Sequence, residues 1–151
     1  MNQNIINLLK VIFISAVPLI EQRGAIPIGI FAHKFSPLTV FIASILGSFL
    51  PVPFILLLFN TIFKWMKNFK FLDKLDGFIE NKVRKGSKKV EKYKELGLII
   101  FVAIPLPTTG LWTGSAIAAF LGLDFKKSLL CILLGGIISA IIITLICVIS
   151  P

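Results

Sequence analysis

The chain has 151 residues, of which 56% are hydrophobic and 15% are charged, and its formal net charge is +9. Residues 38–63 and 96–123 contain no charged residue, and uncharged apolar runs beyond about 18 residues are typical of membrane segments. Since about a quarter of the residues in soluble domains are charged, the composition excludes an ordinary soluble domain. It predicts an all-α integral membrane protein, with residues 1–151 in a single membrane domain.

Residues 1–35 form the first predicted element. Two apolar arms, residues 5–19 and 24–34, meet at the sequence Glu-Gln-Arg-Gly of residues 21–24. Neither arm reaches the ~20 residues that a helix needs to cross hydrocarbon comfortably. Two short arms that meet at a polar break are typical of a re-entrant hairpin with its tip near the middle of the membrane. We expect Pro18 to break the descending arm and residues 21–24 to form the tip.

Residues 36–66 predict the first long transmembrane helix. Ser36 is a favourable helix cap, and Pro37 after it suits the first helical position. The helix is expected to continue to about Met66, with a kink caused by Pro51 and Pro53.

Over residues 67–95 the sequence predicts a basic amphipathic linker of helical structure. Eleven of the sixteen Lys and Arg residues lie between positions 64 and 94, and the positive-inside bias places such a block in the cytoplasm. Apolar residues recur in the linker at helical spacing, which predicts a helix on the inner membrane face, with a soluble amphipathic cap as the alternative. Because no aromatic-rich binding module accompanies the charges, we expect no nucleic acid partner.

Residues 96–123 predict a second re-entrant hairpin. Its arms, residues 96–104 and 111–122, meet at the sequence PLPTTG. Prolines remove backbone donors and open the helix, so we expect hydroxyl groups and freed carbonyls to line a pathway there. The alternative is a packing seam of small residues with the threonines bonded to backbone. The candidate binding residues of this tip are Pro105, Pro107, Thr108, Thr109, Gly110, Trp112 and Thr113. Trp112 is interpreted as a wedge in the cavity or as a membrane-interface anchor.

Residues 124–150 predict the second long transmembrane helix, capped by Asp124, and complete an internal repeat. LLKVIFISAVPL, from Leu8, resembles LGLIIFVAIPL, from Leu96. With the linker in the cytoplasm, the first hairpin enters from outside and the second from inside, and both termini lie outside. The halves are then an inverted repeat, as in secondary transporters; four plain spanning helices are the alternative.

Three motifs carry a resemblance to a known family: PLIEQRGAIPIGI at 18–30, GSFLPVPFILL at 47–57 and FVAIPLPTTGLWTGSAIAAFLGLDFKKSLL at 101–130. They resemble the small multidrug export protein family over nearly the whole chain. That family is distantly similar to the DedA, or VTT, superfamily of inverted-repeat membrane proteins, which includes lipid scramblases and transporters of polyprenyl phosphate carriers. By analogy of fold the resemblance implies lipid transport. The second half lacks the arginine of DedA-like patterns, which argues against a symmetric two-charge mechanism.

Glu21, Arg23 and Gly24 are the candidate binding residues of the first tip. A charge at the centre of a membrane helix costs at least ~2.5 kcal/mol, so we expect this pair to face a cavity and serve function. Stabilisation of the tip is the alternative. Arg23 would bind a phosphate or carboxylate bidentately, Glu21 would carry a proton, and N–H groups at Gly24 would add to the anion site.

These features predict a plasma-membrane, multi-pass transporter or flippase of a small amphipathic anion, such as a polyprenyl phosphate, with proton coupling through Glu21. The alternatives are efflux of drug-like substrates and a non-transporting scaffold that organises membrane lipids. Neither a metal-binding cluster nor a nucleotide loop is found in the sequence, so we expect no cofactor, no metal and no enzymatic activity. A homodimer is predicted from six small residues that allow close helix contacts: Gly47, Ser48, Gly135, Gly136, Ser139 and Ala140.

Overall fold

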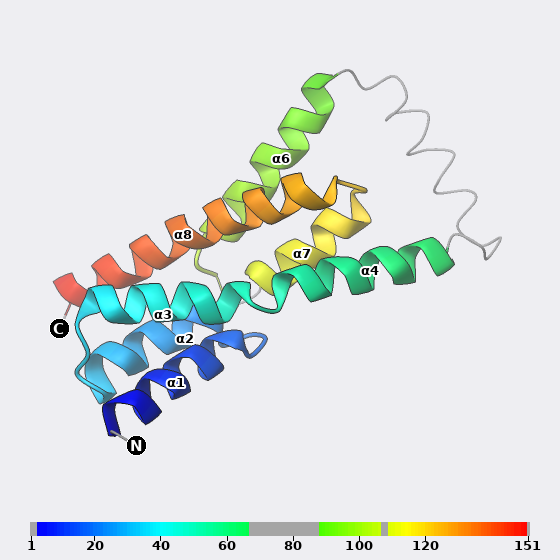
Figure 1. The fold of residues 1–151 in the computed structure, drawn as a ribbon. Helices are drawn as coiled ribbons and strands as arrows, with labels where there is room; N and C mark the ends of the chain where they lie inside the picture. The colour runs from blue at the N-terminus through cyan, green and yellow to red at the C-terminus, as the bar shows by residue number, and fades with distance from the viewer. Residues whose placement is uncertain (1–2, 67–87, 107–108, 151) are drawn as a thin grey trace.

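The computed structural model describes residues 3–66, 88–106 and 109–150, and its regular elements there are all helices (Figure 1). The prediction of an all-helical chain is therefore confirmed for these residues. Two stretches are long and apolar enough to cross a membrane, Pro37–Ile62 and Phe125–Ile149. The elements are α1 (Gln3–Ala16), α2 (Glu21–Pro27), the π-helix η1 (Ile28–Ala32), α3 (Pro37–Phe49), α4 (Val52–Met66), α6 (Lys88–Ala103), α7 (Leu111–Phe120) and α8 (Phe125–Ile149).

The first hairpin consists of α1, a break over residues 17–20, and α2 continued by η1. Helices rarely continue into the residue before a proline, which explains why α1 ends at Ala16. Leu19, with φ of 73°, reverses the chain. The tip predicted at residues 21–24 is therefore displaced: the reversal lies at 17–20 and Glu21 already begins α2.

The first long helix is interrupted as its prolines predict. Ser36 accepts a hydrogen bond from the Thr39 N–H at 3.3 Å and Pro37 occupies the first turn, so the expected cap is confirmed. The chain leaves α3 at Leu50 and Pro51 and resumes as α4, in which Pro53 lies in the first turn. Pro51 has no N–H to donate to the carbonyl four residues earlier, which accounts for the position of the break.

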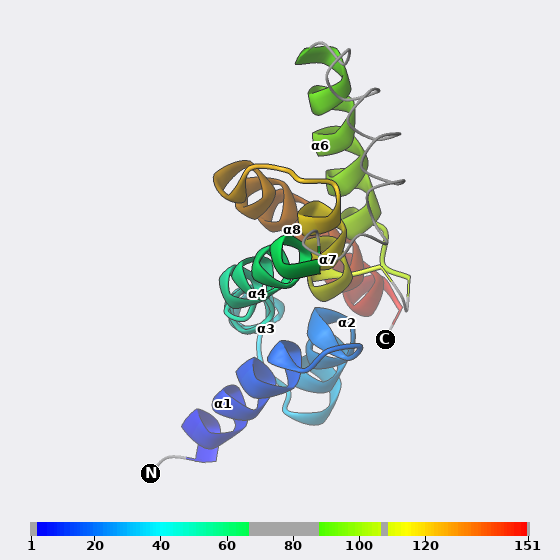
Figure 2. The same cartoon turned by 90° about the vertical axis from the view of Figure 1, so that its right-hand side faces the viewer.

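The second hairpin consists of α6, a break, and α7. Its first arm is longer than predicted, because α6 begins at Lys88 within the basic segment rather than at residue 96; Figure 2 shows this end of α6 projecting beyond the other helices. α7 ends in a Schellman motif: Gly122, with φ of 66°, donates to Ala119, and Leu123 donates to Ala118. The rest of the predicted linker lies outside the described residues.

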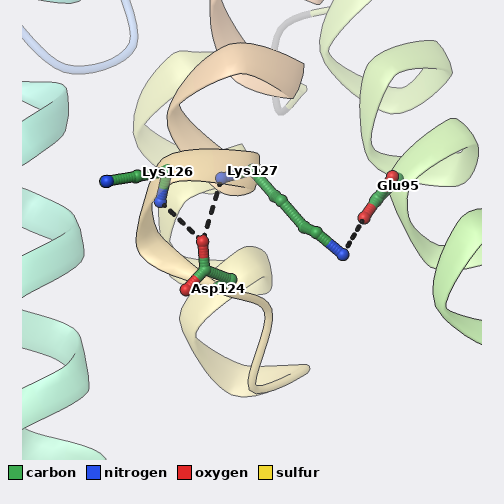
Figure 3. Close-up of polar contacts among 4 residues, drawn as sticks. All are labelled: Glu95, Asp124, Lys126 and Lys127. Atoms are coloured by element: carbon green, nitrogen blue, oxygen red, sulfur yellow. Dashed lines mark hydrogen bonds and ion pairs between the residues drawn. The ribbon is translucent and has the colours of Figure 1, made fainter.

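The last helix, α8, begins at a charged turn that also holds α6 (Figure 3). The Asp124 carboxylate accepts from the backbone N–H groups of Lys126 at 3.2 Å and Lys127 at 3.4 Å, which confirms the predicted cap. The Lys127 ammonium forms a salt bridge of 3.2 Å with Glu95 of α6. The open end of the second hairpin is thus joined to the start of α8.

The hairpins open toward opposite ends of the molecule. In Figure 1, α1 starts at the end where α8 finishes, whereas the turn between α7 and α8 faces the other end. Within each half, α1 packs along α3 and α6 packs along α8. The two halves are joined by contacts of α4 with α7 and by contacts of α2 and α3 with α8. Outward-facing apolar side chains, such as Phe13 at 75% and Phe54 at 69% exposure, form a surface suited to lipid.

The small residues expected at a dimer interface make contacts inside this chain. A side chain on Gly47 would overlap Ser15 and the Ile12 carbonyl, and the Ser48 hydroxyl donates to the Ser15 carbonyl at 3.0 Å. On α8, a Cβ at Gly135 would lie 2.8 Å from the Ile99 carbonyl oxygen. Gly136, Ser139 and Ala140 are buried as well. These small residues therefore pack against neighbouring helices of the same chain. The homodimer stays a prediction, and these positions do not supply its interface.

Candidate functional site

Glu21 joins the two hairpins at their breaks. Its side chain is 3% exposed, and its carboxylate accepts hydrogen bonds from the N–H groups of Leu111 at 3.3 Å and Trp112 at 3.1 Å. Leu111 and Trp112 are the first two residues of α7, whose N–H groups have no partner within their own helix. The start of a helix carries partial positive charge and favours an anion. A carboxylate from the first hairpin therefore caps the helix of the second.

Two features of the backbone permit this contact. Gly110 precedes α7 in an extended conformation, and a Cβ there would overlap the Glu21 carboxylate, so any larger residue would displace the carboxylate from its present position. Glu21 itself has φ of 45°, in the left-handed region. A non-glycine residue in such a conformation costs about 1–3 kcal/mol and persists only where its surroundings hold it. The hydrogen bonds to α7 supply that restraint.

Thr109 closes the second break. Its hydroxyl donates to the Ile104 carbonyl at 2.6 Å and accepts from the Leu106 N–H at 3.2 Å. Its remaining acceptor site receives the Arg23 guanidinium, with 3.4 Å between Nη2 and Oγ1. A hydroxyl has one donor and two acceptor positions, and all three are used. The alternative interpretation, a threonine bonded to backbone, describes Thr109 better than an open pathway group does.

Arg23 is the incompletely satisfied member of the site. The guanidinium has five N–H donors; Nη2 makes the long contact to Thr109, while Nε is buried and has no partner. No salt bridge within 4.0 Å joins Arg23 to Glu21 or to another acid in the described part of the chain. The two charges therefore do not form a salt bridge with each other. Glu21 is satisfied by backbone, and Arg23 retains unused donors.

Trp112 and Gln22 complete the centre. The Trp112 indole N–H donates to the carbonyl of Ala16, the last residue of α1, at 3.3 Å. Trp112 thus makes a polar contact between the two hairpins. Gln22, 1% exposed, donates from Nε2 to the Gly136 carbonyl of α8 at 2.9 Å, while its Oε1 has no partner. Sequence reasoning missed Gln22, although an amide between two charges in an apolar segment is a signal of the same kind.

The structure brings together half of the predicted site residues. Glu21, Arg23, Thr109, Gly110 and Trp112 meet at the two breaks, which lie between the two ends of the molecule (Figure 1). Pro105 lies in the second break and has no N–H to donate.

Gly24 and Thr113 do not join this centre. The Gly24 N–H donates to the Ile20 carbonyl at 3.1 Å, because Gly24 lies within α2, so its predicted contribution to an anion site is wrong. Thr113 is exposed. Pro107 and Thr108 lie outside the described residues. Across the parts of the chain that are described, no three His, Cys, Asp or Glu side chains group together as metal ligands would.

Comparison with known proteins identifies a family. A family model described as "Putative small multi-drug export protein" matches residues 21–142, from Glu21 through most of α8. No curated protein and no solved structure matches the chain.

The unequal satisfaction of the two charges predicts unequal effects on stability. Glu21→Ala leaves two N–H groups of α7 unpaired in the interior and should lower the free energy of unfolding by about 1–3 kcal/mol. Arg23→Ala removes one long contact and should cost less than about 1 kcal/mol. Reversible unfolding in mixed micelles measures both, with Glu95→Ala, which breaks a partly exposed salt bridge, as the control for loss of an acid. A larger loss from Arg23→Ala than from Glu21→Ala would contradict this description of the site.

Proposed function

The chain belongs to the small multidrug export protein family, and from this we propose that it is a membrane transporter whose substrate binds at the centre formed by the two breaks. The proposed substrate is a small amphipathic anion, of which a lipid phosphate such as a polyprenyl phosphate is the model. Its anionic group would bind Arg23, and its apolar part would lie along the outward-facing hydrophobic side chains. We propose no enzymatic step and no cofactor.

The observation that supports an anionic substrate is the incomplete hydrogen bonding of the Arg23 guanidinium. A guanidinium at a membrane-buried position costs at least ~2.5 kcal/mol unless it finds a partner or water. Glu21, the nearest acid in sequence, directs its carboxylate to α7 instead. A phosphate or carboxylate with two oxygens in one plane would engage the guanidinium bidentately. An incoming anion would therefore supply acceptors for the guanidinium donors of Arg23 that no group of the described chain uses.

We propose that each half is a re-entrant hairpin followed by a long spanning helix, and that the halves form an inverted repeat. Three features support this arrangement: hairpin helices such as α2 and α7 of only 7 and 10 residues, breaks at prolines, and hairpins that open toward opposite ends (Figure 1). The basic linker would lie in the cytoplasm and both termini outside, in the plasma membrane. Broken helices that meet in the middle of such a repeat are a known arrangement for substrate sites.

Efflux of drug-like molecules is the second candidate, favoured by the description of the family. Glu21 would then serve as the counter-ion of a cationic drug. Against this, both carboxylate oxygens already accept hydrogen bonds from α7, whereas the unused capacity of the site is cationic. A non-transporting scaffold is the third candidate, and it requires no role for Arg23.

Transport by reconstituted protein distinguishes these candidates. We expect Arg23→Ala to reduce the rate at which a fluorescent short-chain polyprenyl phosphate crosses the bilayer of proteoliposomes by at least about tenfold. Arg23→Lys should restore little of the rate, because an ammonium lacks the planar fork of donors. Lys126→Ala, which removes a cation at the exposed start of α8, is the matched control and should transport normally.

An unchanged rate in Arg23→Ala would contradict anion transport through this site. Transport of a cationic dye but not of the phosphate, with loss in Glu21→Gln, would favour drug efflux. If neither substrate crosses, the scaffold is favoured.

The proposed topology is tested by labelling single cysteines in a variant without Cys131 and Cys147, both of which are buried. We expect a thiol reagent confined to the outside to label cysteines at positions 3–5 and at positions 34–36, because both ends of the first hairpin face that side. Cysteines at positions 123 and 124 should react only when the reagent reaches the cytoplasmic side. Labelling of positions 3–5 and 34–36 from opposite sides would show that the first hairpin spans the membrane.

A further inference from the structure

The proposed anion site is already occupied by an anion of the chain itself. Arg23 contacts Thr109, and Glu21, two residues before it, contacts Leu111 and Trp112. The guanidinium donates to the segment 109–112, and the two N–H groups of that segment donate to Glu21, so all of these donors lie at one short stretch of the chain. The N–H groups are filled by the Glu21 carboxylate, while the guanidinium has a buried Nε without a partner.

We propose that Glu21 is an internal competitor of the substrate, so that the substrate's anionic group takes the place of the Glu21 carboxylate at the start of α7. This inference rests on the proposed function, because it assigns the anion to the site that Arg23 adjoins. In the state described by the structure, Glu21 closes the contact between the hairpins. In the substrate-bound state, the anion lies between Arg23 and the two N–H groups, and Glu21 has moved away.

Space and charge both make the two occupants exclusive. The carboxylate lies so close to Gly110 that not even a methyl group fits between them. A phosphate entering this position would also stand next to a second negative charge in a low-dielectric interior, where like charges repel strongly. One anion at a time can therefore use the donors of α7, and the arrival of one requires the departure of the other.

The first break is built to let Glu21 leave. Leu19 and Glu21 both have left-handed backbone conformations, with φ of 73° and 45°. Such conformations are costly for residues other than glycine, so rotation of this segment to ordinary angles regains part of what leaving the contact loses. Residues 17–20 belong to no regular helix and Glu21 is the first residue of α2, so the rotation disturbs only the start of that helix.

Displacement would couple binding to movement. Glu21 and Trp112 form the polar contacts between the first hairpin and α7. When the substrate's anion replaces Glu21, it bridges Arg23 of one hairpin and α7 of the other, and the carboxylate that held the hairpins together is released. The polar contact between the hairpins then runs through the bound anion, so the arrangement of the hairpins differs between the empty and the substrate-bound protein.

Trp112 provides the measurement, because its N–H is one of the two groups that Glu21 occupies. The chain contains two tryptophans, so Trp65→Phe leaves Trp112 as the sole tryptophan. In this background, farnesyl phosphate is titrated against the protein in neutral-lipid nanodiscs while Trp112 emission is recorded, with farnesol as the uncharged control. We expect Glu21→Gln to bind farnesyl phosphate at least about tenfold more tightly than the parent, which corresponds to ~1.4 kcal/mol. Arg23→Gln should bind it at least about tenfold more weakly, and farnesol should not distinguish the variants.

The outcomes separate this inference from the proposed function. If the parent binds farnesyl phosphate and Glu21→Gln binds it equally or more weakly, Glu21 is a binding or a structural residue. Competition by Glu21 is then refuted, while the proposal of anion transport stands. If neither protein binds the phosphate, both proposals fail, because the site without its competitor should be open. Glu21→Asp, which keeps the charge on a shorter side chain, is measured beside them. It should bind no more tightly than the parent, and a gain equal to that of Glu21→Gln would also refute competition by charge.

Discussion

The carboxylate of Glu21 on the first two N–H groups of α7 is the interaction on which the rest of the arrangement depends. In an apolar solvent, helices gain little from hydrophobic burial against each other, so association relies on close packing and on polar contacts. A broken helix in such a solvent also needs partners for its exposed N–H and carbonyl groups. Here each break supplies the partner of the other. Glu21 satisfies the start of α7, and the Trp112 indole satisfies the carbonyl at the end of α1.

This reciprocity requires close packing within each half, and small residues provide it. Gly47 allows α3 to lie directly against α1, and Gly135 allows α8 to lie against α6. Gly136 then presents its carbonyl to Gln22 of the first hairpin. The same hydrogen-bonded centre thus reaches from the breaks into the middle of α8.

The elements that depend on local chemistry could be predicted from the sequence. Ser36 and Asp124 cap their helices as expected, and Pro51 interrupts the first long helix, because capping and proline effects act within one turn. The start of α6 could not be predicted from the charged segment. Lysine and glutamate are good helix formers, but they are also common in linkers, so the charges do not show where the linker ends and α6 begins. The first reversal was placed several residues late, because a polar sequence drew attention to Glu21 while Pro18 and Leu19 form the turn.

Long-range partners could not be predicted in the same way. The sequence identifies Glu21 and Arg23 as a candidate site because charges are rare in apolar segments, and Thr109 and Trp112 as candidates because they lie at or beside the second break. The hydrogen-bond partners of these side chains could not be predicted. Glu21 bonds to a residue 90 positions away and Gln22 to one 114 positions away. Pairing of Glu21 with Arg23 was the local solution, and the fold satisfies the acid with backbone instead.

Hydrogen exchange at the Trp112 amide tests this account most directly. Protein labelled with ¹⁵N-tryptophan in nanodiscs gives separate backbone signals for Trp112 and for Trp65, which serves as an internal reference far from the breaks. If Glu21 caps α7, Glu21→Ala should accelerate exchange of the Trp112 amide by on the order of tenfold or more, as expected for loss of a buried hydrogen bond, and leave Trp65 unchanged. Equal exchange of the Trp112 amide in the parent and in Glu21→Ala would contradict the central contact.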